Sequence, residues 1–76
     1  MPRSQHSDRY RKLCQLLGET RMKKGLTQAV VAQRLGKPQS YVSKYESGER
    51  RLDVIELLDV ATALNTNVGA LLQKFK

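Results

Sequence analysis

The chain is short of several residue types, and each shortage excludes a kind of structure. Its 76 residues include one cysteine and one histidine, so an internal disulfide cannot form and a zinc site has too few ligands. Three tyrosines, one phenylalanine and no tryptophan require a mainly aliphatic core. No apolar run approaches the roughly 18 residues that span a bilayer, and the start of the chain has no apolar signal region. We therefore expect a soluble, cytoplasmic protein with no membrane contact.

Residues that carry catalysis are equally scarce. The pattern around Cys14 is that of a small apolar residue on a helix, and no cluster of ligand-type residues surrounds His6. No Ser/His/Asp or Cys/His constellation is recognisable. We expect no metal site, no cofactor, no small-molecule ligand and no enzymatic activity.

Positive charge is abundant and unevenly distributed. Fourteen basic residues against seven acidic ones give a net charge of +7. Residues 20–51 hold eight basic and two acidic groups, whereas residues 52–76 hold two basic and three acidic ones. A basic middle next to a nearly neutral end indicates one face for a polyanion and a separate face for another contact.

Apolar residues recur with helical spacing, and no segment alternates like a strand. We predict an all-α domain over residues 8–76, preceded by a flexible arm over residues 1–7. The predicted helices cover about 8–24, 28–35, 38–47, 53–64 and 68 to the C-terminus. Their predicted ends are Gly25, Gly36, Gly48 and Asn65.

Capping residues support these boundaries. Thr27 is a natural N-cap, Pro38 suits the first turn of a helix, and Asp53 with Glu56 has the spacing of a capping box. Gly18 is a poor helix former inside the first helix, and two explanations remain open, close approach of a neighbour or simple tolerance.

Two predicted helices are joined by a short turn that contains Gly36, which is the pattern of a helix-turn-helix unit. The second of them, about 38–47, has two different faces. Val42, Tyr45 and Glu46 share the inner one. The opposite face carries Gln39, Ser40, Ser43, Lys44 and Ser47, with Tyr41 at the margin. Glutamine, lysine and serine are side chains that can bind base edges or phosphates.

The segment "GLTQAVVAQRLGKPQSYVSKYESGE" resembles the Cro and phage-repressor, or lambda repressor-like, helix-turn-helix family. The family's "GLTQ" opening, small residue in helix two, turn glycine, buried aliphatic and closing "E-x-G" are all present. They fall on Gly25–Gln28, Ala32, Gly36, Val42, and Glu46 with Gly48. The segment "RLDVIELLDVATALNTNVGALL" resembles the next two helices, so the likeness covers about residues 10–73. Thr20 and Pro38 depart from the family's usual residues.

The resemblance implies a five-helix lambda repressor-like fold, with residues of about 38–47 entering the major groove as the recognition helix. The implied base-reading positions are Gln39, Ser40, Ser43 and Lys44, with Tyr41 added as a possible contact to a thymine methyl or the sugar backbone. Lys44 is also suited to phosphate, and Tyr41 equally to shielding the core. The expected phosphate contacts are Thr27, Gln28, Lys24, Lys37, Arg50 and Arg51.

The resemblance also implies an ion pair between Arg21, which leans toward the core, and Glu46 on the inner face of the recognition helix. The last helix carries more apolar surface than one small core can use, and such a patch indicates a partner surface. We expect its dimer contacts to be Val68, Leu71, Leu72 and Phe75.

We therefore expect a bacterial or phage-type DNA-binding transcriptional regulator, a repressor or an activator, that binds a two-fold operator as a homodimer and associates with the nucleoid when bound. The alternative is an antitoxin or another protein-interaction module that binds a partner protein through its C-terminal helices. A stable hetero-complex would favour the alternative.

Overall fold

The computed structural model describes residues 8–75, and the predicted arm of residues 1–7 lies outside them. Helices account for the regular structure of this range, and no strand occurs in it. They are α1 (Asp8–Lys23), α2 (Gln28–Leu35), α3 (Gln39–Ser47), α4 (Val54–Ala63) and α5 (Val68–Lys74). The predicted all-α, five-helix fold is confirmed, with helix ends within one or two residues of those expected.

Side chains close the helix ends as the capping pattern predicts. Thr27 Oγ1 accepts a hydrogen bond from the Val30 N–H at 3.1 Å, and Asp53 with Glu56 forms a complete capping box at the start of α4. Gly36 has φ +68°, the left-handed conformation that lets the chain turn sharply from α2 into α3. Pro38 differs slightly from the prediction, because its extended backbone makes it the N-cap and α3 begins one residue later.

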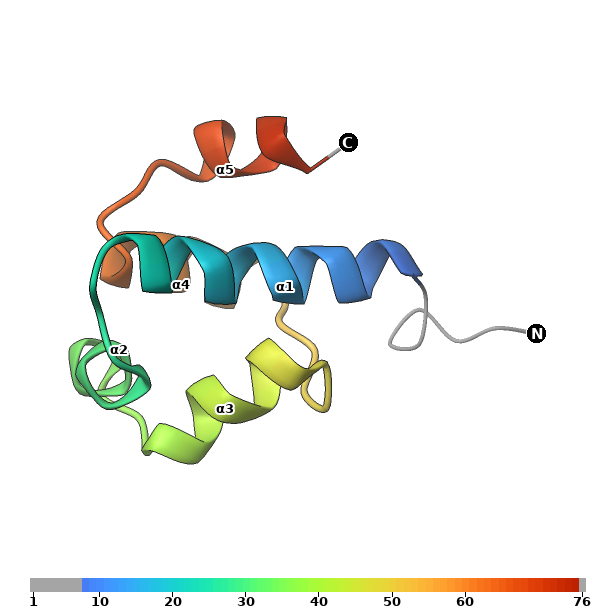
Figure 1. Ribbon diagram of the computed structural model, residues 1–76. Coiled ribbons are helices and arrows are strands. Elements are labelled where there is room, and N and C mark those ends of the chain that lie inside the picture. Colours follow the sequence, from blue (N-terminus) through green and yellow to red (C-terminus); the bar gives the residue numbers. More distant parts are fainter. Residues whose placement is uncertain (1–7, 76) are drawn as a thin grey trace.

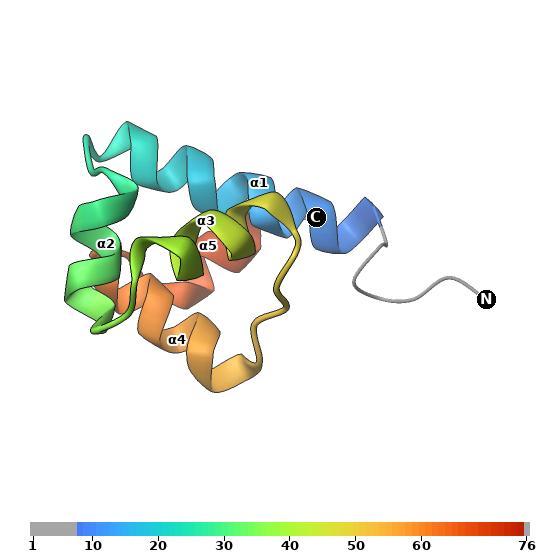
Figure 2. The same ribbon diagram turned by 90° about the horizontal axis from the view of Figure 1, so that it is seen from below.

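The helices are arranged so that α3 lies on an outer face. In Figure 1, α1 crosses the middle of the molecule, α5 lies on one side of it, and α2 and α3 lie on the other. Figure 2 looks at the face that α3 occupies and shows α3 in front, bordered by α1, α2 and α4. α3 packs on α1 and α2, and α4 packs on α2 and α5. α3 thus packs on α1 and α2 with its inner side and leaves its outer side exposed to solvent.

The core is mainly aliphatic, as the scarcity of aromatic residues requires. Its largest fully buried side chains are Tyr45, Leu17, Leu64, Val31, Val42 and Val60. Leu71 also belongs to this core, with only 2% of its surface exposed. The prediction that Leu71 makes a dimer contact is therefore wrong, because α5 needs this side chain to pack against the rest of the domain.

Gly18 is explained by the close approach of a neighbour. A Cβ atom at this position would lie 3.3 Å from Glu46 Oε1 and 3.4 Å from its carboxyl carbon. A side chain at residue 18 would therefore require the Glu46 carboxylate to shift by a few tenths of an ångström.

Among residues 8–75, no single helix is long and apolar enough to cross a membrane. α4 and α5 reach that length and composition only as a pair bent by 101°, and Val60, Ala61 and Leu71 of this pair are buried in the core.

Candidate nucleic-acid interface

The outer face of α3 presents polar side chains to solvent. Gln39, Ser40, Ser43 and Lys44 are all exposed. Val42 and Tyr45, on the opposite side of the helix, have no exposed surface. The structure therefore places four of the five predicted base-reading residues together, on a helix whose other side is anchored in the core.

Tyr41 is the exception. Only 9% of its surface is exposed, and its ring packs edge-on against Tyr45 with the centroids 5.8 Å apart. The Arg50 guanidinium lies 4.6 Å and the Lys37 ammonium 5.4 Å from the centroid of the Tyr41 ring. Burial raises the pKa of its hydroxyl, so the ring stays neutral. Tyr41 shields the core and lies against two cations, as in the second of the two interpretations. It does not share the exposed face of the other four predicted base-reading residues.

An ion pair connects α1 to α3. Arg21 Nε donates to Glu46 Oε2 at 2.6 Å, and Arg21 Nη2 donates to Glu46 Oε1 at 3.1 Å. The two side chains are 14% and 13% exposed. The hydrogen bond from Arg21 to Glu46 raises the pKa of the guanidinium. The expected pair is thus present in the structure and is mostly withdrawn from water.

The same carboxylate anchors the start of α2. Gln28 Nε2 donates to Glu46 Oε1 at 3.0 Å, which turns the amide oxygen of Gln28 toward α3. This oxygen accepts a hydrogen bond from Gln39 Nε2 at 3.4 Å. A continuous chain of side chains, which we call the Arg21–Gln39 network, therefore runs from Arg21 through Glu46 and Gln28 to the first residue of α3.

The network engages one side of the exposed Gln39 amide. One N–H of Gln39 is used by Gln28, whereas its second N–H and its carbonyl oxygen have no partner in the described chain. An amide that offers one donor and one acceptor matches the N7 acceptor and N6 donor of adenine in the major groove. Gln28 itself is half-buried, and its second N–H remains available at the N-terminus of α2, where helical N–H groups favour a phosphate.

The predicted phosphate-binding cations have different surroundings. Lys37 and Arg51 are exposed, and each lies over a tyrosine ring. Arg50 pairs with Glu56 at 3.0 Å, which raises the pKa of the guanidinium and lowers the pKa of the carboxyl. Lys24 donates to the carbonyl of Asn65 at 2.7 Å, in the turn between α4 and α5. This hydrogen bond occupies the ammonium group in the absence of DNA, and the phosphate contact of Lys24 stays a prediction.

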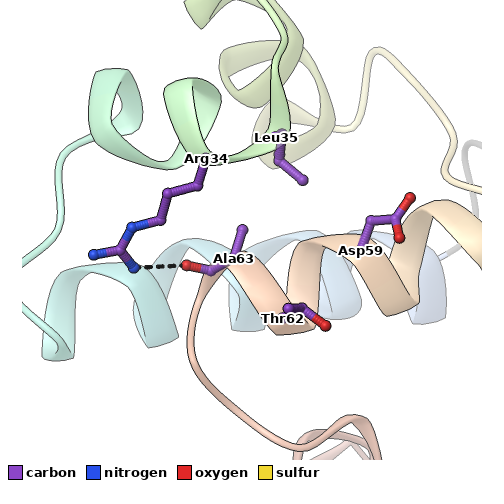
Figure 3. Close-up of a pocket in the computed structure, with 5 residues that line it drawn as sticks. All are labelled: Arg34, Leu35, Asp59, Thr62 and Ala63. Atoms are coloured by element: carbon purple, nitrogen blue, oxygen red, sulfur yellow. Dashed lines mark hydrogen bonds between the residues drawn. The ribbon is translucent and has the colours of Figure 1, made fainter.

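A shallow pocket of about 320 Å³ lies between α2 and α4 (Figure 3). Its lining residues are Arg34, Leu35, Asp59, Thr62 and Ala63. Arg34 Nη1 donates to the Ala63 carbonyl at 2.8 Å, so a cation satisfies the C-terminal end of α4. In the described chain no group of three metal-binding residues occurs.

Exposed apolar residues occur on α4 and α5, and sequence reasoning missed those on α4. Val54, Ile55 and Leu58 of α4 are 72%, 65% and 42% exposed, and Leu72 of α5 is 42% exposed. We call these four residues the α4–α5 apolar surface. Val68 and Phe75 are half-buried, and the Arg9 guanidinium lies 5.7 Å from the centroid of the Phe75 ring. The available signal was that apolar residues surround nearly the whole of α4, although one helix face is enough for packing.

Comparison with known proteins agrees with this geometry. The helix-turn-helix family model matches residues 17–71. No curated protein sequence gives a significant match. An XRE-family-like protein from Pseudomonas syringae pv. tomato is 51% identical over 92% of this chain and 85% of its own, with a TM-score of 0.86. The restriction-modification controller protein C.AhdI from Aeromonas hydrophila is 37% identical over 86% of this chain and 99% of its own, with a TM-score of 0.76.

A third protein shows the same fold. It is the restriction-modification controller protein C.Esp1396I, seen as a tetramer in complex with its natural 35 base-pair operator. It is 21% identical over 92% of each chain, with a TM-score of 0.86, and at this identity the likeness concerns the fold alone. The family model and the first two relatives show that the chain belongs to the XRE, or lambda repressor-like, helix-turn-helix family of DNA-binding regulators.

Proposed function

We propose that the chain is a sequence-specific transcriptional regulator that inserts α3 into the major groove of a two-fold operator as a homodimer. The observation that carries this proposal is the exposed row of Gln39, Ser40, Ser43 and Lys44 on a helix whose inner face is buried. Its activity is binding inside the cell, with no catalytic step. A controller protein of the same fold, bound to its own operator, supports this reading.

Base reading is assigned to the outer face of α3. Gln39 is suited to adenine and Lys44 to guanine, whereas Ser40 and Ser43 can bind a base or a phosphate. The backbone is assigned to Thr27, Gln28, Lys37 and Arg51, because phosphate contacts position a protein on DNA without reading its sequence. Arg50 has a smaller part, because Glu56 already neutralises much of its charge.

The homodimer is assigned to the α4–α5 apolar surface. On the monomer these side chains expose apolar area to water, and burial against a second copy would remove this area from water. This assignment keeps Leu72 from the original prediction and adds Val54, Ile55 and Leu58. A two-fold protein then matches a two-fold operator.

Selection of bound sequences from random double-stranded DNA tests the function. The expected result is one palindromic motif with two half-sites, bound at least about a thousandfold more tightly than random DNA at a stated salt concentration. Failure to enrich any sequence would contradict a sequence-specific regulator. Enrichment of a single half-site would contradict the homodimer.

Charged substitutions test the dimer surface. Ile55→Glu and Leu72→Glu should give folded monomers by size-exclusion chromatography with light scattering, with much weaker operator affinity. Met22→Glu is the matched control, because Met22 is 60% exposed on α1, outside the α4–α5 apolar surface. Dimers of Ile55→Glu at micromolar concentration would place the interface elsewhere.

The exposure of the α4–α5 apolar surface also favours a second candidate, a protein-interaction module such as an antitoxin. A partner protein would then occupy this surface in place of a second copy. The mass of the unmodified protein separates the two candidates. A monomer at micromolar concentration that shows no sequence preference for DNA favours the second.

A further inference from the structure

Tyr10 of α1 contacts three consecutive residues in the loop between α3 and α4. Its hydroxyl donates to the Arg50 carbonyl at 2.9 Å and accepts from the Leu52 N–H at 3.1 Å. The Arg51 guanidinium lies 4.6 Å from the centroid of the Tyr10 ring. These residues are 40 to 42 positions from Tyr10 in the sequence, so the contacts connect the first helix to the end of the recognition unit.

The contacts act on a segment that has no regular structure of its own. Residues 51–53 lie in neither α3 nor α4, and such segments are mobile unless hydrogen bonds hold them. Tyr10 satisfies one carbonyl and one N–H on either side of Arg51, which sets the backbone direction at this residue. Burial raises the pKa of the Tyr10 hydroxyl to about 12, so the group keeps the proton that it donates.

Arg51 itself is charged and available. Its side chain is exposed, and no acidic group within residues 8–75 forms an ion pair with it, in contrast to Arg50 with Glu56. The cation–π contact with the Tyr10 ring favours one position of the guanidinium, so the Arg51 side chain loses less rotamer freedom when it binds a phosphate. A cation that is oriented in advance but not neutralised suits a phosphate.

We propose that Tyr10 is a positioning residue for DNA binding, which holds the loop so that Arg51 meets a backbone phosphate beside the recognition helix. This inference rests on the proposed function. Tyr10 itself precedes residues 17–71, the part of the chain that matches the family model, whereas its partners Arg50, Arg51 and Leu52 lie within that part.

Salt-dependent affinity tests the proposal on the full chain with a selected operator and with random DNA. Arg51→Gln should flatten the slope of log affinity against log salt by about one unit and weaken binding about fivefold at roughly 0.15 M salt, the effect of one lost phosphate contact. Tyr10→Leu should flatten the slope in the same direction and weaken both DNAs alike. Tyr10→Phe keeps the ring and loses both hydrogen bonds, so its effect should be intermediate.

Two comparisons separate positioning from a general loss of stability. In an Arg51→Gln background, Tyr10→Phe should cause no further loss of affinity, whereas a merely structural role would leave its effect unchanged. Lys12→Gln removes an equal charge from the exposed part of α1 and should leave the slope unaltered. If Tyr10→Leu does not fold, Tyr10→Phe in the two backgrounds still decides the matter.

The possible failures can be told apart. If the unmodified protein shows no operator preference, the proposed function is wrong. If it does, but Arg51→Gln keeps the full slope, or Tyr10→Phe weakens binding equally in both backgrounds, the function stands and the positioning role of Tyr10 is wrong.

Discussion

Gln28 donates its amide N–H to Glu46 across 3.0 Å, so the first residue of α2 is held by the last turn of α3. The same carboxylate accepts two hydrogen bonds from Arg21 of α1. One side chain therefore joins three helices and orients the residue that supports Gln39. In this domain the group that joins the three helices also orients the proposed base-reading surface.

Replacement of Glu46 should affect both properties. Glu46→Ala leaves the Arg21 charge withdrawn from water and unpaired, which should lower the free energy of unfolding by roughly 3–5 kcal/mol. Urea denaturation measures this loss. Glu49→Ala is the control, since Glu49 is an exposed acid just beyond α3 whose loss should cost less than about 0.5 kcal/mol. Equal stability of Glu46→Ala and the parent would show that the pair contributes nothing.

Gly18→Ala should destabilise the protein, although alanine is normally the better helix former by about 1 kcal/mol. The new Cβ would lie 3.3 Å from Glu46 Oε1, and Glu46 cannot move without weakening its bonds to Arg21 and Gln28. Thermal unfolding measures the effect. In a Glu46→Ala background the same substitution should become neutral or stabilising. A higher melting temperature for Gly18→Ala alone would contradict the assigned cause.

Gln39 and Gln28 should affect DNA binding in different ways. Gln39→Ala should cost about 1–3 kcal/mol at one base pair and relax the preference there, since a bidentate base contact is lost. Gln28→Ala should weaken binding to both operator and random DNA, with little change in salt slope, because a neutral side chain releases no counterion. Binding titrations on operators with single base-pair changes measure both effects.

The hydrogen bond between the two glutamines adds a coupling to that prediction. Gln28→Ala should also lower the preference at the base pair read by Gln39, although by less than Gln39→Ala does. The double variant should lose less of this preference than the sum of the losses in the two single variants. Unchanged preference at every base pair in Gln39→Ala would exclude it as a base reader.

Much of this architecture was predictable because its signals are local. The N-cap at Thr27 and the capping box at Asp53 act within three residues, and each forms the predicted hydrogen bonds. The surroundings of Lys24 and Tyr10 were not predictable, because their partners lie about 40 residues away. Helical spacing indicated which faces are apolar, but it does not indicate which apolar face remains uncovered, as on α4.

Stability should depend on pH through Glu56. The hydrogen bond from Arg50 lowers the pKa of the Glu56 carboxyl below its usual 4.5, so folding is favoured while the carboxylate is charged. This stabilisation is complete at pH values above the pKa that Glu56 has in the unfolded chain. It is lost as the pH falls through the lower pKa that Glu56 has in the folded protein. Glu56→Gln should therefore be less stable than the parent at neutral pH, with a difference that shrinks below about pH 4.5.

Chemical denaturation at a series of pH values measures that difference. Arg50→Gln is the matched variant, because it removes the donor of the same two hydrogen bonds. In an Arg50→Gln background, Glu56→Gln should lose most of its pH dependence. A constant difference between Glu56→Gln and the parent from neutral to acid pH would contradict the ion pair as the cause.

Tyr45→Phe should leave stability unchanged or raise it by about 1 kcal/mol, because a buried hydroxyl without a partner costs desolvation energy. Tyr45 has no exposed surface, and its hydroxyl has no hydrogen-bond partner among residues 8–75. Thermal and urea unfolding measure the change, and operator affinity should not move. A loss above about 1 kcal/mol would indicate that the hydroxyl binds an internal water.

The uneven charge of the chain affects how it meets DNA before any contact forms. Residues 20–51 include α2 and α3 and carry most of the excess positive charge, whereas residues 52–76, with the α4–α5 apolar surface, are slightly negative. In the field of a polyanion such a molecule experiences a torque that turns α3 forward and the apolar surface away. A larger fraction of encounters with DNA then begins with α3 facing the DNA. Added salt shortens the range of this torque to about 8 Å at physiological ionic strength. We therefore expect salt to slow association more than it speeds dissociation.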